Sequence, residues 1–77
     1  MNSVYLKAVG QFSNRSRFYA LYVVPDLWGG VSLVREFGQI GQPGTLRRHW
    51  HQNKTDAQKQ MNQIKRLQLS RGYNYAN

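Results

Sequence analysis

The sequence predicts an α+β domain in which an antiparallel sheet of about four strands is covered by one C-terminal helix. Two observations carry this expectation: short runs of β-branched and aromatic residues separated by glycine and proline, and a helical apolar stripe near the C-terminus. The chain of 77 residues fits one domain, so we expect a single domain over residues 1–77. It has no cysteine, which excludes disulfides and thiolate metal sites.

Four segments have the composition of strands, and the turn between the second and third contains Pro25 and Gly29-Gly30. The predicted strands cover residues 4–9, 18–24, 31–37 and 45–51. The second strand, FYALYVV, is apolar on both faces, so either a helix covers one face of the sheet or some aromatic side chains stay exposed. We expect Trp50, on the last strand, to be a core residue.

The C-terminal segment has helix signals at both ends. Thr55 and Gln58 have the spacing of a capping box, and Gly72 is a natural end to the helix. We expect the apolar stripe between them to pack on the sheet. The stripe consists of Ala57, Met61, Ile64 and Leu67.

The charge balance indicates a polyanionic partner. Eleven Lys and Arg residues stand against three acids, which gives a formal net charge of +8. Nucleic acid fits this excess because phosphate neutralisation gives affinity for any sequence, and an acidic protein or a ribosome is the other candidate. The acids, Asp26, Glu36 and Asp56, are far apart in the sequence, so we expect no acid–base pair and no enzyme activity.

Two further predictions concern metal binding and the cellular location of the protein. His49 and His51 share one face of a strand, but no third ligand accompanies them, so we expect neither a metal nor another cofactor. The chain has no apolar stretch long enough for a membrane span, and we expect a cytoplasmic protein without a small-molecule substrate.

The segment from Arg35 to Gly44, REFGQIGQPG, predicts an exposed turn shaped for contact. Its three glycines stand at three-residue spacing, directly after the aromatic Phe37. Glycine takes positive φ and lets another backbone approach closely.

The order of these motifs resembles the WGR domain, in particular its small standalone bacterial members. The motifs are FYALYVV, then WGG, then LVREFGQIGQPG, then a basic strand and a helix ending in SRGY, from about Arg17 to Tyr73. The resemblance implies a nucleic-acid-binding module that contacts DNA near a strand end, with a motif tryptophan on the sugar and a motif arginine beside it. Phe37, Gly38 and Gln39 occupy the triplet positions here, so both name-giving side chains are replaced.

We therefore expect a non-enzymatic nucleic-acid-binding module with DNA as its ligand, and a protein–protein adaptor is the alternative. Alternation along a strand places Arg35 on the face of Phe37 and sends Arg47 and Arg48 to opposite faces. Trp28 is either a second stacking group or a lid over the small core. The candidate contact residues are Arg15, Arg17, Trp28, Arg35, Phe37, Gly38, Gln39, Arg47 and Arg48.

Overall fold

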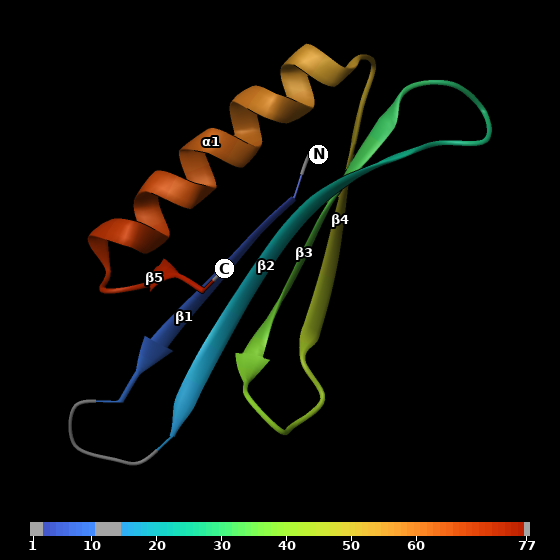
Figure 1. The fold of residues 1–77 in the computed structure, drawn as a ribbon. Helices are drawn as coiled ribbons and strands as arrows, with labels where there is room; N and C mark the ends of the chain where they lie inside the picture. The colour runs from blue at the N-terminus through green and yellow to red at the C-terminus, as the bar shows by residue number, and fades with distance from the viewer. Residues whose placement is uncertain (1–2, 11–14, 77) are drawn as a thin grey trace.

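The residues that the structure describes form an antiparallel sheet of five strands with one helix packed on it (Figure 1). The structure, a computed structural model, describes residues 3–10 and 15–76. The strands are β1 (Ser3–Val9), β2 (Ser16–Pro25), β3 (Val31–Gln39), β4 (Thr45–His51) and β5 (Asn74–Tyr75), and the helix is α1 (Lys54–Ser70). Their order across the sheet is β4-β3-β2-β1-β5. The predicted α+β class is confirmed, and the short β5, which pairs with β1, adds a strand to the four expected.

The helix begins one residue earlier than its predicted cap. Asn53, rather than Thr55, is the N-cap residue: its side-chain oxygen accepts a hydrogen bond from the backbone N–H of Asp56 at 2.9 Å. The capping box predicted from Thr55 and Gln58 is therefore wrong, because Thr55 already lies in the first helical turn. Asp56 sits in that turn, where a negative charge is favourable.

The helix ends as Gly72 predicts. Gly72 has φ +101°, a conformation that glycine adopts without strain. Its N–H donates to the carbonyl of Leu69 at 3.2 Å, and the N–H of Tyr73 donates to the carbonyl of Gln68 at 3.1 Å. This pair of bonds is a Schellman motif, which turns the chain back toward the sheet and into β5.

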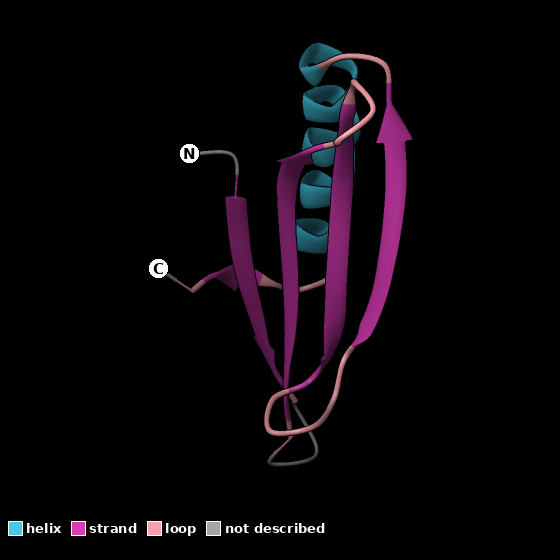
Figure 2. Ribbon diagram, turned by 90° about the vertical axis from the view of Figure 1, so that its right-hand side faces the viewer, coloured by secondary structure: helices cyan, strands magenta, loops and turns pink. Residues whose placement is uncertain are grey.

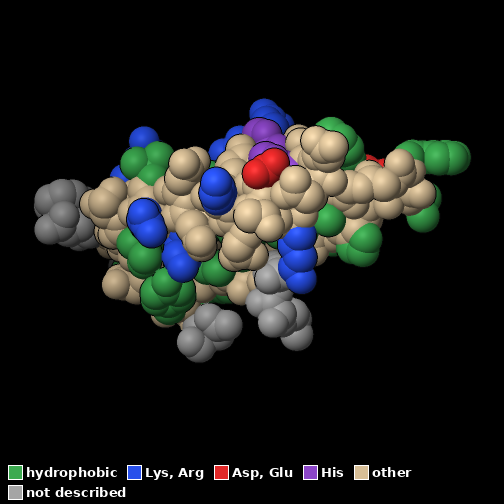
Figure 3. Space-filling view, turned by 90° about the horizontal axis from the view of Figure 1, so that it is seen from above, with side chains coloured by type: hydrophobic (Ala, Val, Ile, Leu, Met, Phe, Trp, Pro, Cys, Tyr) green, Lys and Arg blue, Asp and Glu red, His purple; other side chains and the backbone are tan. Residues whose placement is uncertain are grey.

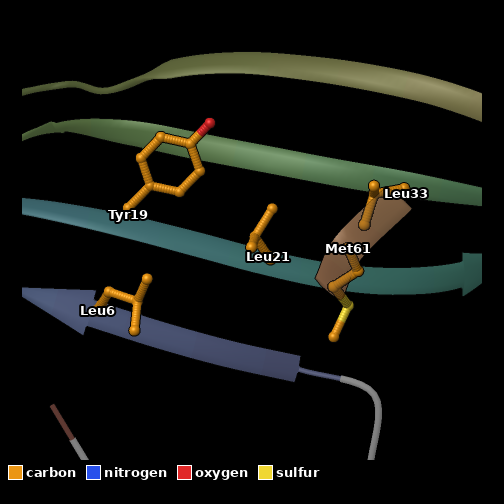
Figure 4. Close-up of a cluster of buried hydrophobic side chains, with 5 residues drawn as sticks. All are labelled: Leu6, Tyr19, Leu21, Leu33 and Met61. Carbon is orange, nitrogen blue, oxygen red and sulfur yellow. The ribbon is translucent and has the colours of Figure 1, made fainter. Parts of the chain in front are cut away.

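The core lies between α1 and one face of the sheet. Leu6, Leu21 and Leu33 are fully buried there, together with Tyr19 and Met61 (Figure 4). We call this side of the sheet the covered face and the opposite side the free face. No described element lies on the free face, onto which Figure 2 looks with α1 behind the sheet.

One part of the predicted helix stripe differs from the structure. Ala57 and Met61 are buried and Ile64 packs against the core, but Leu67 is 47% exposed. Gln68 takes the buried position instead, because spacings of four, three and four residues keep to the side of α1 that faces the sheet. The helix therefore meets the sheet along a partly polar seam at its C-terminal end. No helix of the described residues is long and apolar enough to cross a bilayer.

Trp50 lies outside the core, contrary to the sequence-based expectation. It is 59% exposed on the free face, and its Nε1–H donates to the carbonyl of Gly29 at 3.1 Å. Strand alternation explains the error: His49 and His51, the neighbours of Trp50 in β4, point toward the covered face. Through this hydrogen bond the indole instead holds the loop between β2 and β3 in place.

The glycines after Phe37 have two different roles. Gly41 has φ +89° and makes the turn between β3 and β4. Gly38 and Gly44 allow close packing, because a Cβ on Gly38 would stand 3.2 Å from the Cα of Gly44. A Cβ on Gly44 would come within 2.8 Å of the Phe18 ring. The predicted turn is present, and Gly38 itself still belongs to β3.

Candidate nucleic-acid interface

A cleft of about 440 Å³ opens between the C-terminal half of α1 and the covered face. We call it the arginine cleft, because three arginines and no acids of the described residues line it. Its residues are Arg17 and Tyr19 of β2, Arg35 and Phe37 of β3, Ile64, Leu67 and Gln68 of α1, and Arg71 and Tyr73 after the helix. Residues from three separate segments of the chain thus meet in one hollow.

Three aromatic rings form one wall of the cleft. Tyr19 and Phe37 are directly opposite each other on β2 and β3, and their rings stack with centroids 5.1 Å apart at 10°. Tyr73 meets Tyr19 edge-on at 5.9 Å. Because Tyr19 belongs to the buried core, it fixes the position of the half-buried Phe37 ring. Phe37 therefore packs against the core and also lines the cleft.

Arg35 is held in place by two neighbours. Its Nη1 donates to the Tyr19 hydroxyl at 3.1 Å, and its Nε donates to His49 Nε2 at 3.0 Å. The guanidinium carbon lies 5.9 Å from the centroid of the Phe37 ring. A guanidinium fixed in this way loses little conformational freedom when it binds an anion.

The hydrogen bond from Arg35 requires His49 to accept it with an unprotonated nitrogen. Burial lowers the pKa of His49 below its ordinary value, and the charge of Arg35 and the neighbouring His51 lower it further. The pKa shift and the geometry agree that the positive charge at this point belongs to Arg35.

Arg17 and Arg71 stand on the open sides of the cleft, and both are exposed. Arg17 comes from β2, opposite Gln39 of β3, whereas Arg71 is the C-cap residue of α1. Sequence reasoning missed Arg71 as a site residue. The sequence shows only that Arg71 directly precedes Gly72, and its place in the cleft depends on the direction in which α1 crosses the sheet.

Several other candidate residues lie near the cleft. Arg47 is opposite Arg35 on β4, so it shares the covered face, and its Nη1 donates to the carbonyl of Leu46 at 3.1 Å. Gln39 and Arg15 line a separate hollow of about 470 Å³ beside the turn after β3. The same end of the sheet therefore holds most of the candidate cations.

Two candidates lie elsewhere. Arg48 points to the free face, as the alternation with Arg47 predicts. Trp28 is in the loop between β2 and β3, at the other end of the sheet from the turn after Gly38 (Figure 1). At 93% exposed, its side chain covers nothing, which rules out the reading of Trp28 as a core lid.

The model of the WGR domain family matches residues 2–77. The chain belongs to the WGR domain family. A protein of Sinorhizobium fredii named "Uncharacterized protein y4dW" is 30% identical over 70 residues, which cover 91% of this chain and 34% of that protein. The chain thus spans about a third of the length of this relative. No solved structure gave a significant match.

The WGR family is a nucleic-acid-binding type of module rather than a catalytic one. In this WGR domain the triplet positions lie at the end of β3, where Phe37 lines the cleft and Gln39 stands opposite Arg17. Gln39 has neither the charge nor the five donors of an arginine. Cations at this end of the domain come instead from Arg17, Arg35 and Arg71.

Proposed function

We propose that residues 1–77 form a single, non-enzymatic WGR module that binds DNA in the arginine cleft. The observation that carries this proposal is the convergence of Arg17, Arg35 and Arg71 around Phe37, in a hollow without acids. The net charge of +8 attracts a polyanion from a distance, and the cleft gives it a defined place to bind. The family to which the chain belongs supports the same ligand class.

Each side chain of the cleft has a distinct task in this proposal. The Phe37 ring packs on a sugar or a base, a contact that can contribute about 1–3 kcal/mol per base. Arg35, already fixed by Tyr19 and His49, donates to a phosphate next to that ring. Arg17 and Arg71 are exposed and neutralise the flanking phosphates. They supply the charge that Gln39 lacks.

The test is a titration of labelled duplex, nicked and single-stranded DNA with the protein at two salt concentrations. Three neutralised phosphates predict that duplex affinity falls roughly 40-fold between about 50 and 200 mM salt. Absence of binding at low salt would defeat the proposal. A salt slope near zero would also contradict it, because ion release would then contribute nothing.

A matched pair of variants locates the contact. Arg71 lines the cleft, whereas Arg66 is an exposed arginine of α1 outside it. We expect Arg71→Gln to weaken duplex binding several-fold more than Arg66→Gln, although both remove one charge. Phe37→Leu should reduce binding to nicked DNA without changing the salt slope. Equal effects of the two arginine variants would mean that only the net charge matters.

The loop between β2 and β3 favours a second candidate function, that of a protein–protein adaptor. Leu27 is 95% exposed and Trp28 93%, yet the loop is ordered by hydrogen bonds from the Trp28 N–H to Asp26 and from Trp50 to Gly29. In Figure 3, hydrophobic side chains project at the right-hand end, where this loop lies, and no Lys or Arg side chain is visible there. A rigid apolar tip without cations suits an apolar pocket of a protein better than nucleic acid.

The adaptor is tested by capturing partners from lysate after nuclease treatment. A specific protein that is retained by the wild type and by Arg71→Gln, lost with Trp28→Ser, and bound directly in purified form would favour the adaptor. Loss of every captured protein on nuclease treatment would favour the DNA-binding module.

A further inference from the structure

The free face of the sheet carries aromatic side chains from three strands. Leu6, Tyr19, Leu21 and Leu33 belong to the core on the covered face, so their sequence neighbours point the other way. The aromatic residues that reach the free face are Tyr5 of β1, Phe18 and Tyr22 of β2, and Trp50 of β4. Tyr5 stacks on Phe18 and has Tyr22 as its other diagonal neighbour on β2, whereas Trp50 lies two strands away from β2. A contiguous exposed apolar patch of this kind marks a binding site.

The rings at the centre of the free face are positioned by the fold. Tyr5 and Phe18 are parallel within 5°, with centroids 6.1 Å apart. Phe18 also lies beside Gly38 and Gly44, and a Cβ on Gly44 would come within 2.8 Å of its ring. Tyr5 is 40% exposed, and Phe18 and Tyr22 are half-buried, so part of each ring is accessible to a ligand while the rest packs on the sheet.

Cations border these rings on both sides. Lys7 is directly opposite Phe18, and Arg48 is in the cross-strand row of Tyr22, beyond Val34. Both cations are exposed, whereas Glu36, the single acid among the described residues of this face, is half-buried in β3. The free face thus combines an aromatic centre with cationic edges.

We propose that the free face binds single-stranded nucleic acid, independently of the arginine cleft. Unstacked bases lie on the Tyr5–Phe18 pair and on Tyr22, and the phosphates pass near Lys7 and Arg48. β-Sheets with exposed aromatic side chains and basic edges bind single-stranded nucleic acid in this way, because every base has a face that can stack on a ring. Duplex DNA fits poorly, since its bases are already stacked with one another inside the helix.

Charge also distinguishes this ligand from a second copy of the chain. Two copies that met through their free faces would bring together two molecules of net charge +8, with Lys7 and Arg48 of both at the contact. That arrangement is repulsive, whereas a polyanion neutralises the same side chains. The charge of the protein therefore favours nucleic acid over self-association on this face.

The test uses a labelled oligo(dT) of about 12 nucleotides, a length within the range of known single-strand sites. Tyr5→Leu removes the stacking ring and keeps apolar bulk. Tyr75→Leu is the matched control, since Tyr75 is an exposed tyrosine opposite Leu6 and thus off the free face. We expect Tyr5→Leu to weaken oligo(dT) binding at least about fivefold, Tyr22→Leu to do likewise, and Tyr75→Leu to leave it unchanged.

The remaining outcomes separate this proposal from its rivals. Wild-type affinity for oligo(dT) in both Tyr5→Leu and Tyr22→Leu would overturn it, and so would an equal loss of duplex binding in those variants. A wild-type dimer that Tyr5→Leu dissociates in sedimentation would assign the face to a second copy instead. Retained oligo(dT) binding by a protein that never binds duplex DNA would support this inference and defeat the cleft proposal alone.

Discussion

The two faces of the sheet are made from the same strands but carry different chemistry. Phe18 and Tyr19 are adjacent on β2, as are Arg47 and Arg48 on β4, and each pair is divided between the faces. The covered face carries the core and, beside it, the arginine cleft with the hydrogen-bonded Arg35. The free face instead exposes aromatic rings between Lys7 and Arg48. Strand alternation thus distributes residues that are neighbours in the sequence over two surfaces.

The largest expected effect tests whether stability resides on the covered face. Leu21 is fully buried under α1, so Leu21→Ala should lower the free energy of unfolding by about 2–5 kcal/mol. Leu46, on the free face, is 49% exposed, and Leu46→Ala should cost less than about 1 kcal/mol. Urea denaturation measures both. Similar losses would mean that the free face is packed in solution and the contrast between the faces is false.

A smaller effect is expected where the two faces are coupled. A Cβ on Gly44 would stand 2.8 Å from the Phe18 ring and 3.0 Å from the Phe37 carbonyl oxygen. Gly44→Ala should therefore destabilise the fold by about 1–3 kcal/mol and shift the ring resonances of Phe18. A Cβ on Gly41 would meet no atom within 4 Å, so Gly41→Ala should lower the free energy of unfolding only by the strain of a positive φ, about 1–2 kcal/mol. Unchanged Phe18 resonances in Gly44→Ala would show that the turn does not hold that ring.

Sequence reasoning reached the strands, the helix, the family and the division of Arg47 from Arg48, because each follows from local composition or alternation. It did not predict which face of the sheet the helix covers, because nothing in the sequence around His49 and Trp50 shows which of the two side chains faces the helix. The direction of α1 over the sheet brings Arg71 to Phe37, and only tertiary packing fixes that direction. The cap at Asn53 was missed because Thr55 offered a competing signal two residues later.

The smallest effect concerns pH and the covered face. The pKa of His49 in the folded protein is below its ordinary value of 6.5, so the unfolded chain binds more protons as the pH falls below that value. Stability should therefore decrease from about pH 7.5 to about 5.5. His49→Gln keeps a hydrogen-bond acceptor for Arg35 without a titrating group, and thermal unfolding should then depend less on pH. An equal pH dependence in His51→Gln and His49→Gln would assign the effect to another group.

The most direct measurement of the central claim is amide and side-chain shift mapping by NMR with a short DNA duplex. The cleft proposal predicts that Arg17, Arg35, Phe37 and Arg71 shift together, including the Nε–H of Arg35, while Tyr5 and Tyr22 on the free face do not. Shifts spread evenly over all the arginines, with Phe37 unmoved, would contradict it.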